Sequence, residues 1–193
     1  MGKNLENIVD FIFEKSVIYK VHSNKQSSTH EIDQFIVLSD EGIQLIEELK
    51  LSKELLITKQ KYFLCECKNY KDKVPATWVG KFNTLLEVSG KCQVGILFSY
   101  KGLTGRENSW EDAHGLAKII YYLGDNNSKR YIIDFNINDF ELLNKNRNTS
   151  IIEIIKNKKI AVEIGISSQK LLEDKHDSYD NIATLFQELL IKN

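Results

Sequence analysis

The sequence has little of what marks secreted or membrane proteins. Its 193 residues include three cysteines and one proline. Three cysteines do not form the disulfide framework of a small secreted domain, so we expect a reducing, cytoplasmic location. No hydrophobic run approaches the roughly 20 residues of a membrane-spanning helix, and the N-terminus has no signal-peptide core. We therefore expect neither a membrane anchor nor a leader.

An excess of charge of one sign is also lacking. The chain has 26 Lys and Arg residues against 27 Asp and Glu residues, a net charge of −1, which does not suggest a strongly basic nucleic-acid-binding protein. A local excess of about +4 nevertheless falls in residues 59–81, which can attract a phosphate backbone or can be an ordinary solvated face. Its six lysines are Lys59, Lys61, Lys68, Lys71, Lys73 and Lys81.

What is present is the composition of a globular protein, with 42% hydrophobic and 27% charged residues. A chain of this length buries one substantial core. We expect a core domain at residues 1–145, with an insertion at about 39–61, and a helical extension at residues 146–193 packed on that core.

The first part of the chain alternates helix and strand patterns. Hydrophobic residues at steps of three and four predict an amphipathic helix over residues 3–15. Strands are predicted at 17–21 and 31–38, joined by a polar connector at 22–30 that could be a long turn or a substrate-contacting loop. The insertion carries enough hydrophobic residues for a short helix.

The middle of the chain predicts a parallel unit. A strand at 62–68, a helix at 75–89 that starts at its proline, and a strand at 94–98 imply a right-handed crossover. A helix at 109–123 and an edge strand at 131–135 follow. Asp112 and His114 are two residues apart and do not share a helical face, so we expect both at the surface.

The last part of the chain is predicted to be helical. Ser150 and Glu153 form the pattern of a capping box at the start of one helix. A second helix is predicted at 180–192. These helices either complete the core or present a docking or dimerising face.

The segment at residues 63–70 has ionisable residues inside a hydrophobic strand. Because side chains alternate across a strand, Glu66 and Lys68 point to one face while Cys65 and Cys67 point to the other. Asp33 enters the strand at 31–38 in the same way, so two neighbouring strands could bring the two acids together. Neighbouring carboxylates repel, and a hard divalent cation relieves that repulsion. The Cys-x-Cys pair has no further Cys or His cluster to complete a zinc site.

These residues resemble the PD-(D/E)xK nuclease superfamily, and within it the Mrr-type restriction endonuclease branch. Asp33 stands at the position of the first acid, and Glu66-Cys67-Lys68 matches E-x-K. Ile32 replaces the usual proline before the first acid, as is common in this branch. The remaining matches extend the resemblance over residues 1 to about 135. They are Asn69-Tyr70, Val74, the helix start Gly2-Lys3-Asn4-Leu5-Glu6, and Gly102 to Gly105 after a later strand.

The resemblance implies an α/β restriction-endonuclease-like core, with a central mixed sheet of four to five strands flanked by helices, and C-terminal helices. It also implies a Mg²⁺ site, in which Mn²⁺ can substitute. The expected ligands are Asp33, Glu66, the backbone carbonyl of Cys67 and, through water, Glu6; Asp10 is the rival of Glu6. Lys68 is expected to orient the attacking water and offset phosphate charge.

The function implied is hydrolysis of double-stranded DNA in restriction or antiviral defence. The residues expected to bind DNA are Lys71, Lys73, Lys81 and Lys101. Two alternatives are a nuclease acting on a junction or RNA, and an inactive nuclease-like fold that binds nucleic acid or organises an assembly. A bare Glu66–Lys68 ion pair on a solvent-facing strand is a third. The expected partners are a second copy of the chain and a separate sensor or specificity subunit.

Overall fold

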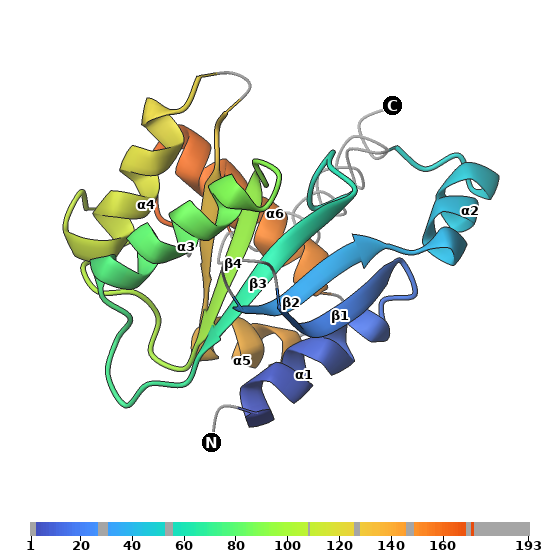
Figure 1. Cartoon of the computed structure of the whole chain (residues 1–193), viewed down its shortest axis with the longest axis horizontal. Coiled ribbons are helices and arrows are strands. Elements are labelled where there is room, and N and C mark those ends of the chain that lie inside the picture. The colour runs from blue at the N-terminus through green and yellow to red at the C-terminus, as the bar shows by residue number, and fades with distance from the viewer. Residues whose placement is uncertain are drawn as a thin grey trace, which may run out of the picture.

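The computed structural model describes residues 3–26, 31–52, 56–107, 109–125, 128–145, 149–168 and 171. This part of the chain forms a five-stranded mixed sheet flanked by six helices (Figure 1), consistent with the expected restriction-endonuclease-like core. The strands, in both chain and sheet order, are β1 (Tyr19–Gln26), β2 (Glu31–Leu38), β3 (Tyr62–Lys68), β4 (Val94–Ser99) and β5 (Tyr131–Phe135). The helices are α1 (Lys3–Glu14), α2 (Asp40–Glu48), α3 (Ala76–Val88), α4 (Asp112–Leu123), α5 (Ile137–Lys145) and α6 (Ile151–Ile164).

The sheet changes direction at β3. Strands β1, β2 and β3 pair antiparallel, whereas β3, β4 and β5 are parallel and are connected through α3 and α4. The parallel crossover predicted from the sequence is therefore confirmed. Because β3, β4 and β5 run the same way, their carboxyl ends lie at one edge of the sheet.

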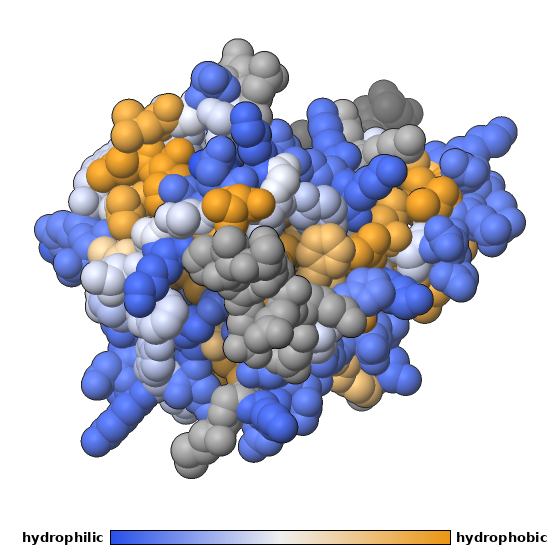
Figure 2. Space-filling model, in the orientation of Figure 1, coloured by the Kyte–Doolittle hydropathy of each residue, from blue (hydrophilic) through white to orange (hydrophobic). Residues whose placement is uncertain are grey.

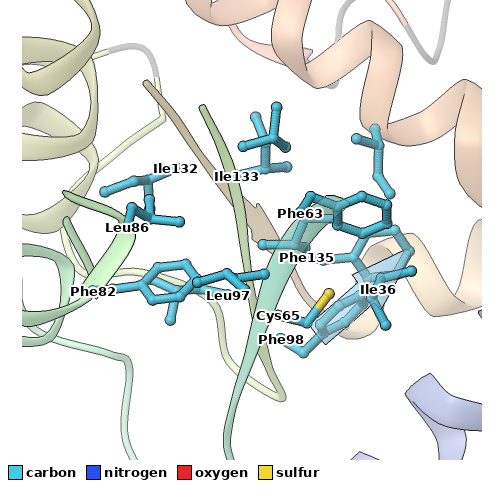
Figure 3. Packing of buried hydrophobic residues seen from close by; sticks show 14 of the residues in the cluster. Ile36, Phe63, Cys65, Phe82, Leu86, Leu97, Phe98, Ile132, Ile133 and Phe135 are labelled. Carbon is cyan, nitrogen blue, oxygen red and sulfur yellow. The ribbon is translucent and has the colours of Figure 1, made fainter. Parts of the chain in front are cut away.

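The hydrophobic core lies on both faces of this sheet. On one face, the ring of Phe13 from α1 lies 5.3 Å from that of Phe63 and 6.4 Å from that of Phe98. On the other face, Phe82 of α3 packs so closely that a side chain at Gly95 would have its first carbon 2.5 Å from the Phe82 ring. Figure 3 shows the phenylalanines of β3 and β4 on one side of the strands and Phe82 on the other.

Helix ends follow the signals in the sequence. Pro75 was predicted to be the first residue of α3, whereas it is the residue just before the helix. Gly90, which follows the end of α3, has a φ of +75°. At the start of α6, Ser150 Oγ accepts a hydrogen bond from the Glu153 N–H at 3.1 Å, as predicted. Such caps satisfy N–H groups that have no partner inside the helix.

Several predictions of secondary structure were wrong in their bounds. Strand β1 extends to residue 26, so most of the predicted connector at 22–30 is strand. These polar residues join the sheet because pairing with β2 uses backbone groups, which need no hydrophobic side chains. Helix α4 begins at Asp112 rather than at residue 109, and α5 was not predicted.

His114 was wrongly predicted to be a surface residue. Asp112 is exposed, but His114 of α4 is partly buried beside β5 and α6, and this burial lowers the pKa of its imidazole. Two-residue spacing on one helix does not reveal which other elements cover it.

The surface in Figure 2 has hydrophobic residues gathered over α4, where Ile119, Tyr122 and Leu123 are exposed. Among the described residues, no helix has the length and hydrophobicity needed to cross a membrane. The predicted helix at 180–192, with its predicted dimer interface, lies outside the described residues, as does Gly2.

Candidate active site

Asp33 and Glu66 lie on the same face of the sheet. The β2–β3 ladder ends at the pair Gln34 and Cys65, and Asp33 and Glu66 are the next residues on the two strands, so both point to the face opposite to that pair. The hydrogen bond from the Cys67 N–H to Asp33 brings Asp33 to the end of β3, where Glu66 and Lys68 are. The site therefore lies where β2 begins and β3 ends, at the lower end of the sheet in Figure 1.

Lys68 forms an ion pair with Glu66 at this end of the sheet. Both side chains are only 12% exposed. Burial alone would lower the pKa of Lys68, but the hydrogen bond to Glu66 and the charges of Glu66 and Asp33 raise it above its ordinary value. Lys68 is therefore an ammonium ion at neutral pH, which can donate hydrogen bonds but cannot take a proton from water.

Asp33 is fixed by the strand beside it. Its Oδ2 accepts a hydrogen bond from the backbone N–H of Cys67 at 2.9 Å. A carboxylate offers about four lone-pair sites, so this bond orients Asp33 and leaves it able to accept more. The same residue whose N–H holds Asp33 is the one whose carbonyl was expected to bind metal.

The two cysteines of β3 point away from this face. The Cys67 thiol donates to Gln34 Oε1, with 3.4 Å between sulfur and oxygen, and Cys65 is fully buried. Burial, followed by the negative charges of Asp33 and Glu6, raises the pKa of Cys67, and burial raises that of Cys65. Both are neutral thiols that pack in the interior rather than nucleophiles.

The acids of α1 are held differently from one another. Asp10 accepts hydrogen bonds from Ser23 Oγ and from Gln34 Nε2, both at 2.8 Å, which fix it against β1 and β2. Glu6 is partly buried, and its backbone carbonyl accepts from Gln34 Nε2 at 2.8 Å. The charge of Glu6 also acts on Cys67 more strongly than that of Asp10 does. Of the two α1 acids, Glu6 is thus the one whose charge acts more strongly on the end of β3.

The sheet separates Glu6 from the other two acids. Gln34 points toward α1, so its chain neighbour Asp33 points to the opposite face, together with Glu66. Helix α1, which carries Glu6, therefore packs on the face of the sheet opposite to these two acids.

Aromatic residues near Lys68 were not predicted to be part of the site. The Lys68 ammonium lies 4.2 Å from the centre of the Trp78 ring, and the Lys81 ammonium lies 4.4 Å from it. The Tyr70 ring lies 5.9 Å from the same tryptophan. Trp78 is partly exposed, packs against the core, and lies beside these two cations. The sequence did contain a signal for the contact of Trp78 with Lys81, because residues three positions apart on a helix are neighbours on its surface.

The lysines at 59–81 do not form one patch. Lys59 and Lys61 precede β3, whereas Lys71 and Lys73 follow it, and a strand of this length separates them by roughly 20 Å. Lys81 lies at the Trp78 ring, and Lys101 lines the same cavity as Lys73. The four lysines predicted to bind DNA are therefore at the carboxyl-end edge with the candidate site, and the other two are not.

The donor set at this edge fits Mg²⁺ in part. Among the described residues, no three His, Cys, Asp or Glu side chains come together as a metal cage. Magnesium, however, is usually held by one or two carboxylates with water and substrate phosphate oxygens. Asp33 and Glu66, on one face just beyond the last pair of the β2–β3 ladder, supply that smaller set.

Comparisons of this chain with protein-family models, with curated proteins and with solved structures find no match.

Proposed function

We propose that this protein is a metal-dependent endonuclease of the PD-(D/E)xK kind that hydrolyses phosphodiester bonds of double-stranded DNA. The observation that supports this most is the meeting of Asp33, Glu66 and Lys68 on one face, where β2 begins and β3 ends. Two acids and a cation at one strand end are costly to desolvate as a structural feature alone. The same three groups suit phosphodiester hydrolysis.

Lys68 would act on the phosphate and not as a base. Because its pKa is raised, it keeps its charge throughout the neutral range. An ammonium ion close to the scissile phosphate stabilises the negative charge that grows on the oxygens in the transition state. It can also donate a hydrogen bond that orients the attacking water.

Asp33 and Glu66 would hold the metal. When bound, a divalent ion neutralises phosphate charge and lowers the pKa of a water ligand. The Cys67 N–H keeps Asp33 oriented before metal or substrate arrives. Glu66 also forms an ion pair with Lys68. Its roles as a metal ligand and as the partner of Lys68 are therefore coupled, and a change at either residue should affect both metal binding and the position of the lysine.

The DNA backbone would approach over the carboxyl ends of β3 and β4. Lys71, Lys73 and Lys101 are exposed there, and Lys81 extends the cationic surface past Trp78. Cutting both strands takes two active sites or two visits, so we extend the proposal to a homodimer or larger assembly. A role in restriction or antiviral defence, with a separate sensor or specificity subunit, completes it.

The test is cleavage of supercoiled plasmid by purified protein, with Mg²⁺, with Mn²⁺ and with chelator. Wild type should nick or linearise DNA only with metal. Glu66→Ala and Lys68→Ala should each abolish cutting while the thermal unfolding profile stays cooperative. Matched controls are Glu48→Ala and Lys91→Ala, which remove exposed residues of the same kinds far from the site and should cut like wild type.

Cleavage that is unchanged in both site variants would refute the assignment. If the wild type binds DNA but never cuts it under any metal condition, the fold serves as a binding or assembly module instead. Cutting of junctions or RNA but not of plasmid would keep the site and change the substrate.

A further inference from the structure

The polar cavity lined by Lys73 and Lys101 lies beside the candidate active site, at the carboxyl ends of β4 and β5. Its volume is about 600 Å³, within the range of pockets that bind small molecules. Its wall comes from the loop after β4, the residues after β5, and parts of α4 and α6. Neighbouring strands are about 4.8 Å apart, so the end of β5 lies about 10 Å from that of β3, where Lys68 is.

The loop after β4 is held tightly against the end of β5. Gly102 has a φ of +73°, and a side chain there would have its first carbon 2.8 Å from Asp134 Oδ2 and 3.1 Å from Asn136 Nδ2. Hydrogen bonds from the Val74 N–H to the Gly102 carbonyl and from the Thr104 N–H to the Val74 carbonyl, both 2.9 Å, join the loop to the segment after β3. Side chains at the end of β5 on one side and backbone hydrogen bonds on the other thus fix this loop beside the cavity.

The floor of the cavity holds ionisable groups that the proposed hydrolysis does not use. Asp134 Oδ2 accepts from Asn136 Nδ2 at 2.9 Å, while Asp134 Oδ1 is buried and has no hydrogen-bond partner among the described residues. Behind the floor is a chamber of about 30 Å³, lined in part by Asp134, His114 and Lys158, with room for about one water. Because burial lowers the pKa of His114, its imidazole is neutral and can both donate and accept.

The rim of the cavity is cationic, in contrast to the acidic Asp134 at the floor. Lys73, Lys101 and Arg106 are exposed cations there, and Tyr100 presents an aromatic side chain that is 58% exposed. A small anion would be attracted by the rim but repelled by Asp134 at the floor. A bare cation would meet Lys158, which is buried and ion-paired with Asp139. The cavity therefore suits a ligand with an anionic end and an end that donates hydrogen bonds.

We infer that this cavity binds a nucleotide. The phosphate lies at Lys101 and Arg106, the base stacks on Tyr100, and N–H groups of the base edge donate to Asp134 through one water. The source is either an unpaired nucleotide of a strand held at the active site or a free nucleotide. Binding itself requires neither metal nor cleavage.

The experiment is calorimetric titration of the full chain with GMP, AMP, CMP and UMP in the presence of chelator. Inorganic phosphate and guanosine are the partial probes, and both should bind at least tenfold more weakly than GMP. GMP should bind tightest, because its base edge carries two adjacent N–H donors. Asp134→Asn should weaken GMP binding by roughly 10- to 100-fold, while Asp40→Asn, at the exposed start of α2, should leave it unchanged.

A second variant guards against a folding defect, since Asp134 is partly buried. Tyr100→Ala alters only an exposed side chain and should weaken GMP binding by roughly 5- to 100-fold because the base can no longer stack. The inference is overturned if no nucleotide binds at millimolar concentration, or if GMP binds wild type, Asp134→Asn and Tyr100→Ala equally.

Titration with a short single-stranded oligonucleotide separates the two sources. If the cavity takes a nucleotide of the bound strand, GMP competes with the oligonucleotide and Asp134→Asn weakens both. If it takes a free nucleotide, the oligonucleotide binds Asp134→Asn as it binds wild type, and GMP does not compete. Either result supports the cavity as a nucleotide site, and neither depends on cleavage.

Discussion

Removal of Lys158 should destabilise the protein strongly and in a pH-dependent manner. Lys158 Nζ lies 2.9 Å from Asp139 Oδ2, and the two side chains are 9% and 4% exposed. The same Asp139 oxygen accepts the Asn136 N–H at 2.8 Å, next to the start of α5. Breaking a buried pair from one side leaves an uncompensated charge and costs roughly 3–5 kcal/mol.

In a domain of this size, each kcal/mol shifts the unfolding midpoint by about 2–4 °C. Lys158→Met should therefore lower Tm at pH 7 by about 6–20 °C. The matched control is Lys145→Met. Lys145 Nζ lies at the same distance, 2.9 Å, from Glu141, but the side chains of Lys145 and Glu141 are 72% and 52% exposed. Such exposed ion pairs contribute roughly 0–1 kcal/mol to the free energy of unfolding.

The loss of stability in Lys158→Met, relative to wild type, should become smaller as the pH falls. Burial already raises the pKa of Asp139 beside Lys158, and removal of the lysine raises it further. A folded-state pKa above the unfolded value of about 3.9 means that the folded variant gains a proton first. Its relative stability is then lost as pH rises through the folded pKa and recovered at lower pH.

The measurement is thermal unfolding followed by circular dichroism at pH 7 and pH 5. Adding Asp139→Asn to Lys158→Met removes the buried charge, so the double variant should lose less stability than the two single variants together. A Tm change below about 3 °C for Lys158→Met, with no pH dependence, would refute the buried pair.

Two further predictions concern charged residues at the carboxyl-end edge. Changing Lys71, Lys73 and Lys81 together to Glu should flatten the slope of log DNA affinity against log salt concentration by roughly 0.9 for each phosphate that is no longer neutralised. The control variant, Lys59→Glu with Lys61→Glu, should keep the wild-type slope. Equal slopes in all three proteins would place the DNA path elsewhere. Glu107→Gln should destabilise the protein above pH of about 4.3 and have no effect well below it. Burial would raise the pKa of Glu107, but Ser168, Lys158 and Ser167 lower it, so its contribution is lost as pH falls through the folded value; a pH-independent difference in Tm would contradict this.

Strong local patterns predicted the part of the fold that carries the site. Strands β2 and β3 have the predicted bounds, since hydrophobic residues alternate with Asp33 and Glu66 in them. Alternation also correctly assigned Glu66 and Lys68 to one face and the cysteines to the other. These features depend on near neighbours in the chain, which is why the sequence alone was sufficient.

Features that depend on distant segments were missed. Lys158 resembles a polar residue of an ordinary helix, yet its burial comes from β5 and α5, whose acids lie around it. His114 is buried by β5 and α6, which follow it in the chain. Trp78 looks like a core residue from its helical spacing, but the end of β3 brings Lys68 to its ring. No local pattern records these contacts.

The choice between Glu6 and Asp10 can now be tested with separate readouts. Asp10 is bound to Ser23 and Gln34, so Asp10→Asn loses charged hydrogen bonds and should lower Tm. The charge of Glu6 acts on Cys67 more strongly than that of Asp10, so Glu6→Gln should instead lower cleavage by roughly 10- to 100-fold, partly restored by higher Mg²⁺ or by Mn²⁺.

The two variants are measured side by side for Tm and for plasmid cleavage, each with a metal titration. A metal-dependent loss of activity in Asp10→Asn alone would move the outer ligand one turn along α1. If neither variant responds to metal, Asp33 and Glu66 form the site without the helix. Because α1 packs on the other face of the sheet from those acids, we expect Glu6 to act through water and more weakly than a direct ligand. Glu6→Gln should then lower activity less than Glu66→Ala does, without a change in Tm.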